Sequence, residues 1–141
     1  MEIILGKPQI RGNSDVIFNY GAASAIAAGA AVKRTGEKEI AVFDGSGIPF
    51  GVSGYADNKN TPNKVAVIEA GKSVGVLLDD ANEAISVGAQ VYITAGGKFT
   101  AVATDNTPTA AVFVEKGDAL NLATGEKIAN GAALIDMVGG F

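Results

Sequence analysis

The sequence predicts a small all-β fold, and three observations support this prediction. Apolar residues alternate at Val65 and Val67, and again at Val74, Val76 and Leu78, which is the period of a half-buried strand. Turn residues recur at intervals of roughly 8 to 12 residues, the spacing of short strands in a sandwich or barrel. Helical periodicity is scarce along the chain. We therefore expect one small barrel-like body built of short strands.

The expected elements follow one another along most of the chain. Residues 39–55 and residues 90–104 each have two β-rich runs around a glycine-rich turn, which predicts two β-hairpins. Residues 22–31 are a helix candidate through alanine propensity alone, and residues 79–85 are a weaker one. Further short strands are expected at residues 107–115 and 133–138.

One phrase of the sequence occurs twice. Residues 25–49 align without a gap to residues 84–108, and the core of the match is Ile-x-x-Gly-x-x-Val. The second copy leads into a strand-like stretch, so we expect the first copy to be strand-like as well. No reactive side chain is repeated, so the phrase predicts a joint in which a glycine at positive φ closes a turn between two buried anchors. With two looser copies included, the expected turn glycines are Gly29, Gly71, Gly88 and Gly131.

Length and charge limit the classes of function. The chain has 141 residues, a net charge of −4 and no run of Lys or Arg. It therefore has no electrostatic footprint for nucleic acid or a membrane surface, and we expect neither as a partner. No stretch approaches the roughly 18 apolar residues of a membrane span, and no signal peptide is recognisable. The predicted organisation is an N-terminal arm or first strand over residues 1–20 and a single β domain over residues 21–141.

Side chains that perform catalysis are scarce. The chain has no His and no Cys, so it lacks the usual general base at neutral pH, a thiolate nucleophile and the ligands of a zinc site. Asp79, Asp80 and Glu83 form an acidic cluster, and residues 44–47 superficially match a phosphate or calcium loop. Turns explain both patterns. We expect no enzyme activity, no catalytic residue, no cofactor and no metal site.

The central part of the chain resembles the capsid decoration proteins of tailed phages, also called structural cement proteins. The matching segments are residues 70–76 (Ala-Gly-Lys-Ser-Val-Gly-Val), residues 84–91 (Ala-Ile-Ser-Val-Gly-Ala-Gln-Val) and residues 96–98 (Gly-Gly-Lys). The resemblance implies a structural virion protein that binds the outside of an assembled capsid and stabilises it. The all-β fold that we expect for the chain is barrel-like, or of the β-clip or β-tulip type.

The resemblance also implies partners and a location. The partners are the major capsid protein and neighbouring copies of the chain itself, with a trimer slightly preferred and a dimer as the alternative. The location is the capsid surface of the virion, reached after assembly in the host cytoplasm. The absence of Cys agrees with assembly in a reducing compartment.

The two ends of the chain are the expected adhesive surfaces. Residues 1–20 suit either an extended arm that adds a strand to a neighbour's sheet or the first strand of the body. At the other end, Gly139 and Gly140 would let the last residue reach a pocket on a partner or on the body itself, or leave the tail frayed. The expected capsid or subunit contacts are Ile3, Ile4, Leu5, Ile10 and Phe141.

Two other classes of function remain open from the sequence. A carbohydrate-binding or host-attachment module is the main alternative, although the chain has no Trp and only Tyr20, Tyr55 and Tyr92 for stacking on sugar rings. A small enzyme using the carboxylates of Asp79 and Asp80 is the second.

Overall fold

The structure is a computed structural model, described here for residues 1–9, 16–54 and 64–141. These residues form ten strands and no helix, so the all-β prediction is confirmed. The strands are β1 (Glu2–Ile4), β2 (Val16–Ala22), β3 (Ala31–Gly36), β4 (Glu39–Val42), β5 (Pro49–Ser53), β6 (Lys64–Leu77), β7 (Gln90–Ile93), β8 (Phe99–Thr100), β9 (Thr107–Leu120) and β10 (Lys127–Met137).

Five strands close into a first barrel. They lie in the order β2-β4-β3-β5-β6, and pairing between β2 and β6 closes the ring. Only the first half of β6, residues 64–70, pairs with β2. The interior is filled by the buried side chains of Tyr20, Ala22, Val32, Ile40, Val65 and Val67.

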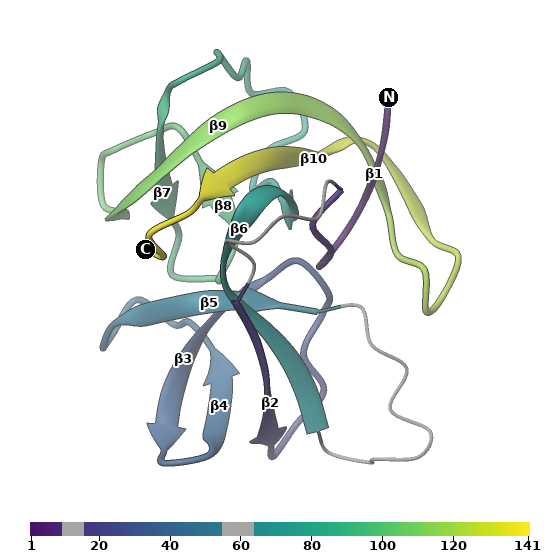
Figure 1. Cartoon of the computed structure of the whole chain (residues 1–141). Helices are drawn as coiled ribbons and strands as arrows, with labels where there is room; N and C mark the ends of the chain where they lie inside the picture. Colours follow the sequence, from purple (N-terminus) through teal and green to yellow (C-terminus); the bar gives the residue numbers. More distant parts are fainter. Residues whose placement is uncertain (10–15, 55–63) are drawn as a thin grey trace.

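The second half of β6 begins a second five-stranded unit. It pairs with β10, which is followed by β9, β7 and β8. A parallel bridge between Leu78 and Phe99 joins β8 back to the end of β6, and we call this unit the second barrel. Figure 1 shows the two barrels one above the other, with β6 running from one into the other.

A single large core joins the two barrels. It fills the second barrel and also includes Val52 and Ile68, which belong to strands of the first. Val67 lies in the interior of the first barrel whereas Ile68 lies in this larger core, because successive side chains of a strand point to opposite faces. The outer face of the first barrel thus packs on the interior of the second.

The two copies of the repeated phrase form the same turn. Gly29 and Gly88 have φ values of 81° and 82°, in the left-handed region that favours glycine. The residue after each glycine donates its N–H to the carbonyl three residues earlier. A strand starts directly afterwards in both copies, β3 in the first and β7 in the second.

The equivalence extends through the hairpins that follow the turns. The β3–β4 hairpin and the β7–β8 hairpin have the same register, and the two prolines matched in the sequence occupy equivalent places on the next strand. The corresponding pairs are Lys33–Ala41 and Tyr92–Thr100 within the hairpins, and Lys33–Pro49 and Tyr92–Pro108 beside them. Each barrel therefore contains one copy of the same turn, hairpin and flanking strand.

The hairpin predicted for residues 39–55 is wrong. Strands β4 and β5 form there, but β3 lies between them: Val32 pairs with Val42 on one side and with Gly51 on the other. The connection therefore crosses over an intervening strand. The hairpin predicted for residues 90–104 is present, as β7 paired with β8.

Neither helix candidate is helical. Residues 25–30 form the joint between β2 and β3, where Ala28, Ala30 and Ala31 are buried. Burial of these small side chains and the left-handed Gly29 override the helix propensity of alanine. Residues 79–85 contain a turn in which the N–H of Glu83 donates to the carbonyl of Asp80, 3.1 Å away.

The turns predicted at Gly71 and Gly131 are also wrong. Both residues lie inside long strands, β6 and β10. A Cβ at Gly131 would lie 2.6 Å from Cγ2 of Ile128, so the glycine there permits close packing within the strand. Gly71 pairs with Met137, and Ala132, directly after Gly131, pairs with Leu77 and Gly117, so both strands continue past these glycines.

The irregular backbone near these glycines falls on other residues. Ser73 and Asn130 have φ values of 50° and 56°, and the strand register shifts beside each of them. The N–H of Ser73 donates to Asp136 Oδ1 at 2.8 Å, and the N–H of Asn130 donates to Asp118 Oδ1 at 2.9 Å. A carboxylate therefore stabilises each bulge through the backbone.

We predict that valine substitutions distinguish the two turn glycines. Gly88→Val should lower the free energy of unfolding by about 1–3 kcal/mol, because a β-branched residue is strained at positive φ. Gly29→Val should cost more, because its Cβ would also lie 3.1 Å from the Leu5 side chain, whereas the site at Gly88 is open. Gly139→Val, at an open site outside the left-handed region, is the control. Equal midpoints of urea unfolding for all three variants would contradict the role of the turns.

Candidate functional site

The first residues of the chain belong to its own body. β1 runs parallel to β9, with Glu2 opposite Asp118 and Ile3 opposite Ala119. Ile3 is 0% exposed and Leu5 is 3% exposed, and both lie in a core cluster between β1, β9 and β10. The prediction that Ile3 and Leu5 contact the capsid is therefore wrong, because pairing with β9 turns both side chains inward. Ile4 is half-buried, and Ile10 lies outside the described residues.

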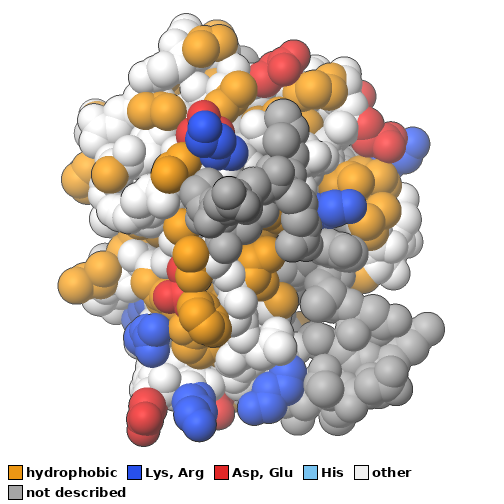
Figure 2. All heavy atoms as spheres, viewed as in Figure 1, with side chains coloured by type: hydrophobic (Ala, Val, Ile, Leu, Met, Phe, Trp, Pro, Cys, Tyr) orange, Lys and Arg blue, Asp and Glu red, His pale blue; other side chains and the backbone are white. Residues whose placement is uncertain are grey.

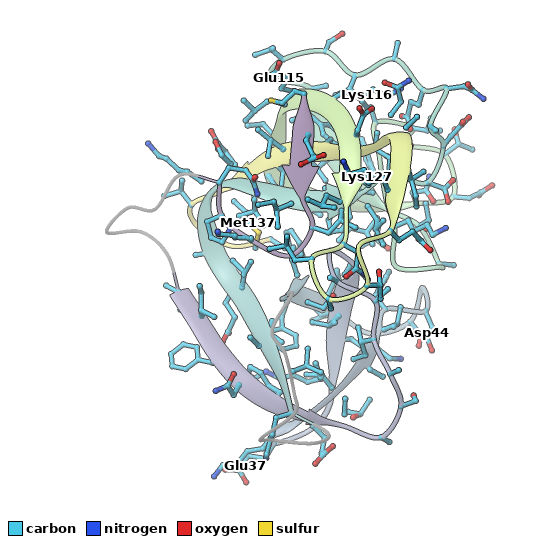
Figure 3. The ribbon with its side chains drawn as sticks, turned by 90° about the vertical axis from the view of Figure 1, so that its right-hand side faces the viewer. Glu37, Asp44, Glu115, Lys116, Lys127 and Met137 are labelled. Atoms are coloured by element: carbon cyan, nitrogen blue, oxygen red, sulfur yellow. The ribbon has the colours of Figure 1, made fainter. Side chains whose placement is uncertain are left out.

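Two glycines allow the backbone of this N-terminal segment to pack closely on the body. A Cβ at Gly75 would overlap the carbonyl oxygen of Ile4, and a Cβ at Gly117 would lie 2.6 Å from the carbonyl oxygen of Met1. Lys127 also holds Glu2 through an ion pair of 2.9 Å. Figure 3 shows β1 lying on the second barrel with Lys127 beside it.

The C-terminal residue also packs on the body. The rings of Phe141 and Phe99 are 5.9 Å apart, and Phe141 is a half-buried neighbour of the large core. The tail turns back at Gly140, whose φ is 83° and whose N–H donates to the carbonyl of Met137. Of the two positions considered for Phe141, on a partner or on its own body, the structure shows the second.

We predict that Ile3→Ala lowers the free energy of unfolding by about 2–4 kcal/mol, because it leaves a cavity under β1. Ile48→Ala is the matched control, because Ile48 is 82% exposed and its truncation should change stability by less than about 0.5 kcal/mol. Urea unfolding followed by circular dichroism measures both values. An Ile3→Ala variant as stable as the control would show that the segment is not part of the core.

Two residues of the acidic cluster, Asp80 and Glu83, stabilise a loop through hydrogen bonds. Both carboxylate oxygens of Glu83 accept the hydroxyl of Thr100, and Oε1 also accepts the N–H of Ala101 at 2.7 Å. Asp80 accepts the N–H of Asn82 in a local turn. Among residues 1–9, 16–54 and 64–141, no group of three or more His, Cys, Asp or Glu is arranged to hold a metal ion. These contacts are those of a structural loop.

The Asp-Gly-Ser-Gly segment is likewise a turn held by its own side chains. Asp44 accepts Nζ of Lys33 at 2.8 Å, and the N–H and hydroxyl of Ser46 at 3.0 and 2.7 Å. These hydrogen bonds, that of Lys33 foremost, hold the pKa of Asp44 well below its usual value. Oδ1 of this carboxylate is therefore bound by Ser46 within the turn and by Lys33 of β3.

An apolar strip on β2 is the surface feature that sequence analysis missed. Val16, Ile17 and Phe18 are 39%, 36% and 56% exposed, and Asn19 beside them is exposed as well. We call residues 16–19 the β2 strip. Its sequence signal is a run of three apolar residues without alternation, unlike a strand with one buried face. Figure 2 shows hydrophobic side chains exposed in the middle of one face of the molecule and elsewhere on it, with Lys and Arg at the end of the first barrel and on the upper part of the face.

Tyr20, the next residue of β2 after the β2 strip, is buried in the first barrel and held by several polar contacts. The hydroxyl of Tyr20 donates to Glu69 Oε2 at 2.8 Å and accepts Nη2 of Arg34 at 3.0 Å. The guanidinium of Arg34 lies 5.1 Å from the centre of the Tyr20 ring and 4.8 Å from that of Phe50. Burial of Tyr20, followed by its hydrogen bond to Glu69, raises the pKa of the phenol.

We predict that the contacts of Tyr20 stabilise the fold less at alkaline pH. Because the pKa of Tyr20 is raised in the fold, the stability it contributes is complete below the unfolded pKa of about 10 and is lost as pH rises through the folded pKa. Tyr20→Phe removes this titration. Between pH of about 9.5 and 11.5, the parent should therefore lose stability more steeply than the variant in urea unfolding. Equal pH slopes would contradict the predicted direction.

Neither described tyrosine is freely exposed for stacking on a sugar ring, whereas the ring of Phe18 is exposed. Tyr20 is buried, Tyr92 is half-buried and Tyr55 lies outside the described residues. A hollow of about 390 Å³ between the barrels is lined mostly by small apolar side chains, from residues 25–28 and 65–66, and by the turn 121–124. Among the described residues that line it, none has an aromatic or charged side chain. No helix among the described residues has the length and hydrophobicity needed to cross a membrane.

Comparison with known proteins gives a likeness in fold. No family model matches the chain, and no curated protein matches its sequence. A chain of the solved structure "The capsid of Myoviridae Phage XM1" superposes with a TM-score of 0.70 at 19% sequence identity. The match covers 94% of this chain and 88% of that chain. At this identity the likeness shows a shared all-β architecture.

Proposed function

We propose that this protein is a structural component of a phage capsid, and that it decorates the assembled shell from outside and stabilises it. The observation that carries the proposal is the fold match, because it spans nearly the whole of both chains. The matched chain belongs to a structure described as a phage capsid. The resemblance of residues 70–98 to decoration proteins points to the same role from the sequence.

The chemistry of the surface supports a structural role. The described acidic and hydroxyl side chains most suggestive of a site, those of Asp44, Ser46 and Glu83, hold turns and loops of the fold. An apolar strip without a charged side chain is exposed on β2. Such a surface suits contact with another protein.

The proposed partners are the major capsid protein and neighbouring copies of this chain. A three-residue apolar strip makes a weak contact alone. Several weak contacts to adjacent shell subunits add through effective concentration once those subunits are fixed in a lattice. We therefore propose that the protein joins the capsid surface after assembly and prefers expanded shells to free subunits.

We predict that the purified protein cosediments with empty expanded shells of its capsid and raises the temperature at which they break. Free capsid subunits should bind it at least about tenfold more weakly, because they lack the lattice geometry. Since the β2 strip has no charge, raising the salt concentration should change binding little. Absence of cosedimentation, or equal affinity for free subunits, would contradict the proposal.

A further inference from the structure

Strand β2 of the first barrel has a structural equivalent in the second barrel. Phe18 pairs with Val67 in the first barrel, and Val74 pairs with Ile135 in the second. β2 ends beside β4 in a parallel pair at Ala22, just as β6 ends beside β8 in a parallel bridge at Leu78. Residues 17–22 of β2 therefore correspond to residues 73–77 of β6 and to Leu78, which follows it.

In the second barrel the outer edge of this strand is occupied by the chain's own N-terminal segment. The N–H of Gly6 donates to the carbonyl of Gly75 at 2.9 Å, and the N–H of Gly75 donates to the carbonyl of Lys7 at 3.1 Å. The N–H of Gln9 donates to the carbonyl of Ser73 at 2.9 Å, and Pro8 and Val74 form an antiparallel bridge. Residues 6–9 thus run antiparallel along the edge and bind it through backbone hydrogen bonds and one β-bridge.

In the first barrel the corresponding edge has no partner among the described residues. β4 pairs with β2 only at Gly21 and Ala22. The N–H of Gly21 donates to the carbonyl of Lys38, on the side of β2 that faces away from β6. Because backbone groups alternate along a strand, those of Asn19 and Ile17 point to the same side. They correspond to Gly75 and Ser73, the residues that bind the N-terminal segment in the second barrel.

We propose that the edge of the β2 strip accepts an extended segment of a capsid shell subunit, which adds an antiparallel strand there. The N–H and carbonyl of Asn19 and the carbonyl of Ile17 make the hydrogen bonds, as Gly75 and Ser73 do in the second barrel. This inference rests on the proposed function and names the contact through which it is exercised. Strand addition is an established way for one chain to bind another through the backbone.

The size of the strip favours a shell subunit over a second copy as the occupant. The three apolar side chains are between 36% and 56% exposed, far less area than the roughly 800 Å² per partner of a stable interface. A dimer held by this strip alone would dissociate in solution. One such contact is sufficient when other contacts to the same lattice act together with it.

The strip also indicates the composition of the added segment. Ile17 and Phe18 project from opposite faces of β2, and no residue of the strip is charged. An exposed edge that is apolar and has no protecting charge is normally avoided in a protein that stays alone. The segment is therefore uncharged and apolar on both faces.

Asn19→Pro tests the proposal directly. Proline removes the outward N–H but leaves the pairing of β2 with β6, whose hydrogen bonds lie on the other side, so the fold should tolerate it. We expect the variant to unfold near the temperature of the parent and to bind expanded shells about tenfold more weakly. Asn19→Ala retains the N–H, so it should lose less than about threefold in affinity. An equal loss for both variants would place the contact in the side chain and overturn strand addition.

Hydrogen exchange on loaded shells gives a second readout that does not depend on a variant. The amide of Asn19 should exchange about tenfold more slowly on shells than in the free protein. The amide of Gly75, already bonded to Lys7, should not change. Unchanged exchange at Asn19, or full binding by Asn19→Pro, overturns the inference while leaving the decoration role intact. If protection at Asn19 rises with protein concentration in the absence of shells, the occupant is a second copy of this chain. If the parent protein does not bind shells, the decoration role and this inference are both rejected.

Discussion

The sharing of β6 between two barrels is the constraint on which the rest of the structure depends. This strand of 14 residues pairs with β2 and β5 in its first half and with β10 in its second half. The change of partner occurs near Ser73, where a bulge is fixed by Asp136. Because one continuous backbone belongs to both rings, the barrels cannot rotate independently. The large core between them follows from that fixed arrangement.

The duplicated plan also creates two equivalent strand edges with different fates. Residues 6–9 cover the edge in the second barrel, and close packing of Ile3 and Ile4 over Gly75 holds the preceding residues in place. The equivalent edge in the first barrel carries Val16, Ile17 and Phe18 in contact with solvent. The same hydrogen-bonding geometry therefore serves folding in one barrel and, by our proposal, binding in the other. The repetition thus identifies the edge of β2, which has no partner among the described residues, as a candidate site.

The sequence predicted the strand content and the repeat because both depend on local patterns. Alternation at Val65, Val67, Val74 and Val76 located β6, and the repeated phrase located the turns at Gly29 and Gly88. Pairing depends on contacts far apart in the chain, which local patterns do not contain. The insertion of β3 between β4 and β5 was missed for that reason.

The candidate site was harder to predict than the fold. Ile3 and Leu5 have the composition of an adhesive arm, and only the parallel pairing with β9 makes them core residues. Val16 to Phe18 have the composition of core residues, and they are exposed because β4 begins only opposite Gly21 and does not run alongside them. Composition alone does not distinguish these two cases, because burial is decided by which strand lies alongside.

The most direct test of the account is a cryo-electron microscopy reconstruction of expanded shells loaded with this protein. We predict that the protein lies on the outer surface of the shell, with a strand of a shell subunit running antiparallel to residues 16–19 at hydrogen-bonding distance. A reconstruction in which the protein is bound but the edge of β2 faces solvent would contradict the proposed contact. A shell surface that carries none of the protein would contradict the central claim.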